Sequence, residues 1–129
     1  MVDVSYQMLK KVGLESVAGE YSRNLPYGAQ RRLEIARALA TDPFLLLLDE
    51  PAAGMNPQET LELKEMVIRI REEFQVSVLL IEHDMKMVMS LSDRIYVMEY
   101  GRVISTGTPA QVSADPQVIR AYLGEESDA

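Results

Sequence analysis

Three side chains able to do chemistry stand directly after two apolar stretches. Asp49 and Glu50 follow the run at residues 44–48, and His83 comes shortly after the run at residues 76–81. Paired carboxylates can divide two tasks, because one can hold Mg²⁺ beside phosphates while the other polarises an attacking water. The single histidine can donate to a phosphate or hold that water. The pattern predicts a phosphate-handling site, and the simpler alternatives are a polar strand end and a purely structural histidine.

A glycine turn lies upstream of these carboxylates. It leads into a segment rich in strong helix formers and consists of Leu25, Pro26, Tyr27, Gly28, Ala29 and Gln30. A helix that begins at such a turn presents free N–H groups and the positive end of its dipole, which suits an anion. The simpler interpretation is an ordinary helix start.

The elements that position these residues alternate between helix and strand. A helical segment is expected within residues 1–24, and the Pro-Tyr-Gly turn is followed by a helix through Ala40 that ends before Pro43. The strand at residues 44–48 is apolar at every position. Such a strand predicts a parallel sheet with helices on both faces.

The second half of the chain continues this alternation. Apolar residues spaced at i, i+3, i+4 and i+7 predict a helix from Pro57 to Phe74, and a buried strand is expected at residues 76–81. The remaining expected elements are a methionine-rich helix through Leu91, a hairpin of strands 94–99 and 102–106 around Tyr100-Gly101, closing helices at 109–112 and 117–123, and a frayed acidic tail at 125–129. This order indicates an α/β fold, in which ligands bind beyond the carboxyl ends of the strands.

Composition narrows the classes of function. The chain has 129 residues, a formal net charge of −7 and no cysteine. The acidic balance disfavours a nucleic-acid partner, and the absence of cysteine excludes disulfide scaffolds and thiolate zinc sites. The longest apolar run, residues 44–48, is too short to span a bilayer, so no direct membrane insertion is expected. We expect a soluble intracellular domain.

Taken together, these segments resemble the ATPases of ATP-binding cassette (ABC) transporters. The motifs follow in the order of that family: LPYGAQRRLEIARAL, LLLLDEP, GMNP, LLIEHD and GRVISTGTP. The first three motifs, from LPYGAQRRLEIARAL to GMNP, are similar to those of the LivG-type subfamily, which is associated with the uptake of branched-chain amino acids. The resemblance covers Leu25 to about Leu123 and implies a partial P-loop NTPase fold of the α/β class, with parallel strands, flanking helices and a C-terminal β-hairpin.

The resemblance also implies a role for each candidate residue. Asp49 would be the Walker B carboxylate that holds Mg²⁺, Glu50 the catalytic glutamate, and His83 the switch histidine at the γ-phosphate of ATP. Residues 25–30 would form the signature loop, which closes over ATP held by another subunit. The D-loop, which crosses the dimer interface, would consist of Gly54, Met55 and Asn56.

Two motifs depart from the usual family pattern. The commonest signature is LSGGQ, whereas this chain has Pro26 and Ala29 within that loop. Pro26 supplies neither a hydroxyl nor an N–H, so contact with phosphate would depend more on Gly28. Asn56 stands where the D-loop usually has Asp, which removes a charge and keeps the capacity for hydrogen bonding.

A larger departure is the P-loop, G-x-x-x-x-G-K-[ST], whose amides and lysine hold the phosphates. None of the lysines in these 129 residues is preceded by glycine; they are Lys10, Lys11, Lys64 and Lys86. Since the signature and Walker B regions alone hold little of a triphosphate, we expect weak or no ATP and Mg²⁺ binding. The chain by itself is therefore predicted to show no ATPase activity.

The resemblance further implies a domain layout. The chain would be the C-terminal portion of one ATPase domain, with a signature helical region at 1–43, a core at 44–108, and helices and a tail at 109–129. In the family, the P-loop strand lies between the strand before His83 and the next strand, so an open strand edge is expected here. Such an edge predicts self-association, as a homodimer or a domain-swapped oligomer.

Three functions remain open at this point. The first is an ATPase portion of an importer, with a second ATPase subunit and transmembrane permease subunits as partners, held at the inner face of the cell membrane through the permease. The second is a non-catalytic module that dimerises or binds an intact ATPase subunit. The third is an unrelated metal-dependent hydrolase built on Asp49, Glu50, Glu82 and His83. A single histidine with adjacent carboxylates is a poor set of metal ligands, which disfavours this third function.

Overall fold

The computed structural model describes residues 2–124, and the predicted fraying at residues 125–129 lies outside the described residues. The chain divides into two compact units, with the boundary between Ile81 and Glu82. Each unit has its own strand pair and its own buried residues.

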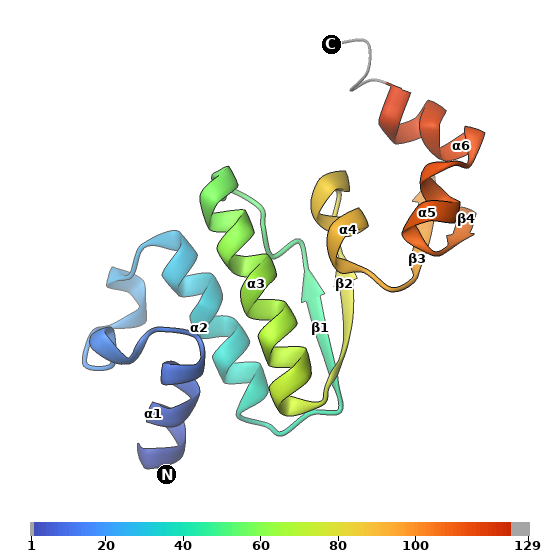
Figure 1. Cartoon of the computed structure of the whole chain (residues 1–129). Helices are drawn as coiled ribbons and strands as arrows, with labels where there is room; N and C mark the ends of the chain where they lie inside the picture. Colours follow the sequence, from blue (N-terminus) through green and yellow to red (C-terminus); the bar gives the residue numbers. More distant parts are fainter. Residues whose placement is uncertain (1, 125–129) are drawn as a thin grey trace. The chain divides into compact units, whose positions relative to one another are not determined.

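The first unit is built around two parallel strands. Its elements follow in the order α1 (Val2–Lys11), 3₁₀ turns at Glu15–Val17 and Ser22–Asn24, α2 (Tyr27–Leu39), β1 (Leu45–Asp49), α3 (Pro57–Phe74) and β2 (Ser77–Ile81) (Figure 1). The strands pair in register from Leu45 opposite Ser77 to Asp49 opposite Ile81. The predicted parallel pairing is present, and α3 connects the two strands as a βαβ unit.

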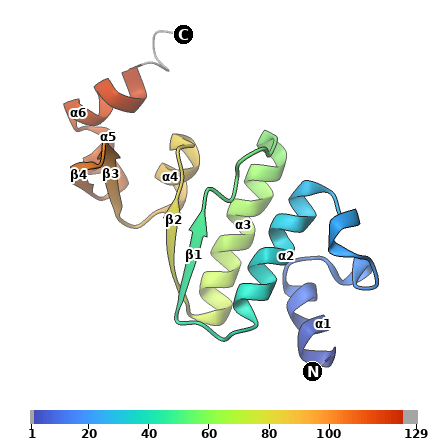
Figure 2. The same cartoon turned by 180° about the vertical axis from the view of Figure 1, so that it is seen from behind.

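The core of this unit lies between the strands and two helices. Figures 1 and 2 show α2 and α3 side by side next to the strand pair. The apolar stripe predicted for the third helix is buried almost as expected, and the buried residues of the two helices are Ile35, Ala36, Leu39, Leu63, Met66, Val67 and Ile70. The first helix also joins this unit: α1 contacts α2, and Nζ of Lys11 in α1 lies 2.8 Å from Oε2 of Glu73 in α3.

The prediction that the first strand is covered on both faces is wrong for the described residues. Leu46 and Leu48 are buried, whereas Leu45 and Leu47 are 43% and 66% exposed. On β2 the residues of the same face, Leu79 among them, are also exposed. The reason is that buried and exposed residues alternate along β1, so within the described part of the first unit one face of the strand pair is covered and the opposite face is not.

The start of α2 also differs from the prediction. The Pro-Tyr-Gly segment was expected to be a turn, but Tyr27 and Gly28 already belong to the helix. Pro26 is the N-cap residue, with φ −56° and ψ 156°. Its fixed φ prepares an extended N-cap, and the first N–H groups of a helix need no partner inside the helix, so the helix can begin directly after proline.

The second unit consists of short elements around a hairpin. They are α4 (Met85–Leu91), β3 (Ile95–Glu99), β4 (Arg102–Gly107), α5 (Pro109–Ser113), α6 (Pro116–Val118) and a π-helical turn at Ile119–Leu123. Strand order and position agree with the predicted hairpin and closing helices. Its core contains Ile95, Val97, Val112 and Val118.

The hairpin turn lies at the predicted residues, Tyr100 and Gly101. Tyr100 and Gly101 have φ values of +48° and +76°, and two consecutive left-handed residues make the turn that matches the twist of antiparallel strands. A register shift between Val97 and Met98 adds a bulge to the ladder.

Between residues 2 and 124, no helix has the length and apolar character needed to cross a membrane.

Candidate functional site

The carboxylate pair lies at the carboxyl end of β1. Asp49 is the last residue of the strand and pairs with Ile81, the last residue of β2. The next residue, Glu50, donates its backbone N–H to the carbonyl oxygen of Ile81 at 2.8 Å. Both acidic residues are exposed. The sequence therefore predicted correctly that these residues stand at the carboxyl end of a parallel strand.

Glu50 has an unusual backbone conformation. Its φ is +47°, in the left-handed region that non-glycine residues rarely occupy. The other non-glycine residues with positive φ are Asp42, Gln75 and Tyr100, which stand at helix ends and in the hairpin turn, where this conformation is common. Glu50 follows a strand, where a left-handed non-glycine residue is uncommon and costs on the order of 1 kcal/mol.

His83 lies after the end of β2 and belongs to the second unit. Its side chain is exposed, and its backbone N–H donates to Glu82 Oε1 at 3.1 Å. The following residue, Asp84, caps α4 by accepting the Met87 N–H at 3.2 Å. The histidine therefore stands in the connection between a parallel strand and a capped helix.

The signature segment, residues 25–30, forms the start of α2. No side-chain acceptor closes this start, because Pro26 is its N-cap residue. Gln30 instead donates its side-chain amide to the carbonyl oxygen of Leu25 at 2.9 Å and so holds the entry of the chain into the helix. The first amides of α2 are thus not occupied by a capping side chain, which is the arrangement that an anion can use.

Tyr27 and Arg31 pair on the first two turns of α2. The Tyr27 hydroxyl accepts a hydrogen bond from Arg31 Nε at 2.9 Å, and the guanidinium carbon lies 5.0 Å from the centre of the ring. This hydrogen bond raises the pKa of Arg31 above its ordinary value. The pair fixes the orientation of the Tyr27 ring from one side.

The D-loop segment forms the start of α3, and here side chains close the helix end. Asn56 Oδ1 accepts the Glu59 N–H at 2.8 Å, and Glu59 Oε1 accepts the Asn56 N–H at 3.5 Å. Pro57 is the first helical residue, as predicted. This is a capping box, and Gly54 before it has a left-handed φ of +79°.

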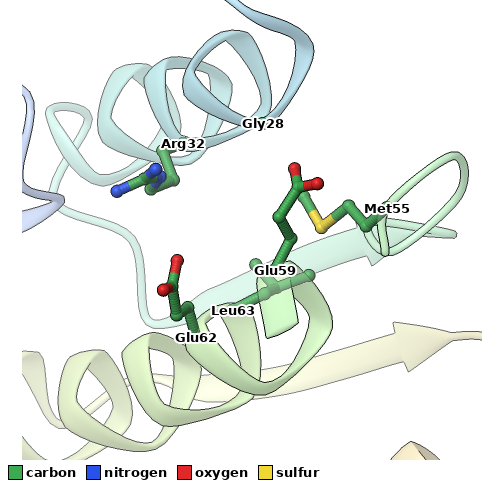
Figure 3. A pocket seen from close by; sticks show the side chains of 6 residues that line it. All are labelled: Gly28, Arg32, Met55, Glu59, Glu62 and Leu63. Atoms are coloured by element: carbon green, nitrogen blue, oxygen red, sulfur yellow. The ribbon is translucent and has the colours of Figure 1, made fainter. Parts of the chain in front are cut away.

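The signature and D-loop segments are in contact with each other. A Cβ atom at Gly54 would lie 3.2 Å from the Tyr27 ring, and a Cβ atom at Gly28 would lie 2.8 Å from Glu59 Oε2. Figure 3 shows Glu59 pointing from α3 towards Gly28. Between the two helices is a cavity of about 20 Å³, enough for one water. Its lining consists of Gly28, Arg32, Met55, Glu59, Glu62 and Leu63.

Sequence reasoning missed Glu59, although a signal for it was present. The spacing of Asn56 and Glu59 is that of a capping box, in which the third helical residue reaches back to the N-cap. That pattern predicts the hydrogen bonds at the start of α3. It does not predict the contact with Gly28, which depends on how two helices pack.

The acidic residues do not form a chelating cluster of their own. Across residues 2–124, no group of three or more His, Cys, Asp and Glu side chains could hold a metal ion. Asp49 instead lines a hollow of about 440 Å³ beside Arg31 and Arg37 of α2. A single exposed carboxylate of this kind suits Mg²⁺ only when phosphates and waters supply the other ligands.

Two family models match the chain. The model described as "ABC transporter" matches residues 2–53, which include the signature segment and the carboxylate pair. The model described as "Branched-chain amino acid ATP-binding cassette transporter" matches residues 102–128.

Two relatives agree with these models. The high-affinity branched-chain amino acid transport ATP-binding protein LivG of Escherichia coli K12 is 52% identical over 124 residues, which are 96% of this chain and 49% of LivG. The corresponding BraF protein of Pseudomonas aeruginosa PAO1 is 54% identical over 117 residues, 91% of this chain and 46% of BraF. The chain spans about half the length of these relatives.

Solved structures show the same fold. MJ1267, an ATP-binding cassette of an ABC transporter in its ADP conformation, matches with a TM-score of 0.85 at 29% identity and covers 95% of this chain and 50% of its own. CbiO1 from Clostridium perfringens, part of the ABC transporter complex CbiONQ, matches with a TM-score of 0.82 at 29% identity, over 98% and 53% of the two chains. The two units thus correspond to part of an ATP-binding cassette fold.

Proposed function

This chain belongs to the ATP-binding proteins of ABC transporters, and from that membership we propose that it works within an ATPase that energises the uptake of branched-chain amino acids. The observation that carries the proposal is the carboxylate pair Asp49 and Glu50, which stands at the carboxyl end of the parallel strand β1, next to the end of β2. The names of LivG and BraF, high-affinity branched-chain amino acid transport ATP-binding proteins, support branched-chain amino acids as the transported solutes.

Within this function, the strand-end residues divide the chemistry. Asp49 is the group that would hold Mg²⁺, which when bound neutralises phosphate charge. Glu50 orients and polarises the attacking water, and its left-handed backbone sets the direction of its side chain. His83 donates a hydrogen bond to the γ-phosphate.

The signature and D-loop segments act at the contact with another subunit. Residues 25–30 close over ATP that another subunit holds, with the N–H of Gly28 as the main donor. Gly54, Met55 and Asn56 cross the interface between the subunits. The partners are therefore a second ATPase subunit or a second copy of this chain, together with transmembrane permease subunits that hold the assembly at the inner face of the membrane.

The 129 residues need a P-loop from another source. None of their lysines lies in a G-x-x-x-x-G-K-[ST] pattern, so backbone amides and a lysine for the β- and γ-phosphates are not present in this sequence. We infer that the chain alone binds ATP and Mg²⁺ weakly and does not hydrolyse ATP.

A second candidate function is supported by the uncovered face of the strand pair. Leu45, Leu47, Leu79 and Ile81 expose an apolar surface there, from 43% to 66% exposed. Parallel sheets are normally covered on both faces, so this surface favours association with another polypeptide. In this case the chain is a non-catalytic module that dimerises or binds an intact ATPase subunit.

Phosphate release measures the first function directly. The purified chain is assayed with Mg²⁺ and ATP, alone and after co-production with the half of E. coli LivG that it does not match. We expect no turnover by either part, turnover by the mixture, and loss of that turnover in Glu50→Gln. Glu65→Gln, on the exposed side of α3, is the matched control and should leave turnover unchanged.

The same mixture separates the two candidates. A stable complex without turnover would favour the interaction module. Steady turnover by the chain alone, sensitive to Glu50→Gln, would contradict its proposed inactivity. Absence of both a complex and turnover would contradict the proposed association.

A further inference from the structure

The starts of α2 and α3 touch at two places, although they are far apart in sequence. We propose that Tyr27 is a positioning residue that locks the signature segment to the D-loop, so that the two segments move as one block. The inference rests on the proposed function, in which both segments meet another subunit. The contact itself is a property of this chain alone.

The first contact is between the Tyr27 ring and the backbone of Gly54. A Cβ atom at Gly54 would lie 3.2 Å from Cε1 of the ring and 3.7 Å from Cζ. The φ of Gly54 is +79°, a conformation that side chains disfavour. Glycine therefore serves two needs here: it allows the left-handed backbone, and it lets the ring lie directly against the D-loop.

Arg31 also holds the ring. Its guanidinium donates to the Tyr27 hydroxyl and lies over the ring, so Tyr27 contacts both α2 and the D-loop. A ring held by two partners transmits a displacement better than a side chain that can rotate freely. The ring, more than the hydroxyl, makes the contact with Gly54.

Glu59 supplies a second contact, which runs from α3 to the first turn of α2. Its carboxylate reaches back to the Asn56 N–H and also lies against Gly28, where a Cβ atom would be 2.8 Å from Oε2. The side chain that helps to cap α3 thus touches the first turn of α2. A shift of the D-loop would therefore reach Gly28, the residue proposed to donate to phosphate, through both Tyr27 and Glu59.

Proton NMR of the 129-residue chain tests the contact. The ring current of Tyr27 should move the α-protons of Gly54 away from their ordinary chemical shifts in the unmodified chain. The shift should remain in Tyr27→Phe, which keeps the ring. It should disappear in Tyr27→Leu, and the amide signals of Met55 and Asn56 should move with it.

Tyr21→Leu is the matched control, because Tyr21 is an exposed tyrosine that stands before the 3₁₀ turn at Ser22–Asn24 and outside α2. It should leave the signals of Gly54, Met55 and Asn56 in place. Ordinary α-proton shifts for Gly54 in the unmodified chain would overturn the proposal, and this measurement needs no variant to fold. Changes in Tyr27→Leu that stay within residues 26–31 would overturn it as well.

A kinetic measurement separates this inference from the proposed function. In the mixture with the LivG half, Tyr27→Leu should lower kcat several-fold more than Tyr27→Phe does, because only leucine removes the ring. If the mixture does not hydrolyse ATP, the proposed function fails while the NMR result still decides the coupling. If the mixture is active and both variants are equally impaired, the hydroxyl matters and the ring contact does not position the loops.

Discussion

The helices α2 and α3 begin at the two loops that the proposed function needs, yet their first turns are built differently. At α2, Pro26 offers no side-chain acceptor, and the first amides are left without a capping side chain. At α3, Asn56 and Glu59 cap the helix reciprocally. One start is open to a ligand, and the other is closed by its own residues.

This difference follows the proposed roles of the two loops. A helix start without a capping side chain keeps its N–H groups and its dipole available to a phosphate. A capped start has already used those donors, so it is suited to hold a loop in one shape at an interface. The contact between Tyr27 and Gly54 joins the open start to the closed one, and the rigid α3 start thereby supports the signature segment.

The largest expected effect on stability comes from removing the side chain that caps the start of α3. Asn56→Ala removes the acceptor for the Glu59 N–H and should lower the free energy of unfolding by about 1 kcal/mol. Urea unfolding followed by circular dichroism measures this change. Pro26→Ala is the comparison at α2 and should change stability by less than about 0.5 kcal/mol, because no capping hydrogen bond is lost there. Equal losses in the two variants would mean that the starts do not differ in the way described.

A smaller effect is expected from the reciprocal half of the capping box. Glu59→Leu removes the acceptor for the Asn56 N–H and should lower the free energy of unfolding by about 0.5 kcal/mol. Glu59→Gln keeps an acceptor at the same place and should stay close to the unmodified chain. Urea midpoints of the two variants provide the measurement, and a larger loss in Glu59→Gln would show that charge, and not the hydrogen bond, holds this start.

Local signals made much of the fold predictable. Pro57 predicted the first residue of α3 and the apolar spacing predicted its buried face, and Tyr100-Gly101 identified the hairpin turn, because each depends on residues close in sequence. The chain position of Asp49 and Glu50 after an apolar strand placed them at the correct end of β1. These features follow from local sequence alone.

Coverage of the strand pair was not predictable in the same way. A run of leucines is compatible with a strand covered on one face or on both, since either coverage depends on which distant elements pack there. In this chain Leu46 and Leu48 face the helices while Leu45 and Leu47 do not. The left-handed backbone of Glu50 and the contact of Tyr27 with Gly54 likewise depend on tertiary packing. They have no signature in a short stretch of sequence.

Closing the open start of α2 should have a still smaller effect on stability. Pro26→Ser adds a hydroxyl that can accept from the first turn of the helix, and this gain is partly offset by the loss of the rigid proline. A net stabilisation of about 0.3 kcal/mol is expected from urea unfolding. The same variant should raise ATP-dependent turnover of the mixture with the LivG half, because serine is the residue of the commonest signature at this position and its hydroxyl can also donate to phosphate. Lower turnover with a stabilised helix would show that the hydroxyl instead competes with phosphate for the amides.

A third helix start, that of α6, can be compared with the other two because its N-cap residue, Asp115, carries a titratable carboxylate. At α6, Asp115 accepts the Gln117 N–H at 2.9 Å, and hydrogen bonds from the Ser105 side chain and from this amide lower the pKa of Asp115 below 3.8. Because the folded pKa is depressed, the stabilisation is present above the unfolded pKa and is lost as the pH falls through the folded one.

The amide signal of Gln117 should therefore titrate with a midpoint below 3.8, as followed by NMR between pH 6 and pH 2. Gln111 is the control within the same unit, because its N–H is held by the neutral hydroxyl of Thr108 at 3.2 Å. In Asp115→Asn the titration of the Gln117 signal should vanish while the cap remains. A midpoint at or above 3.8 would mean that the carboxylate gains nothing from its hydrogen bonds, and α6 would then be capped no better than α2.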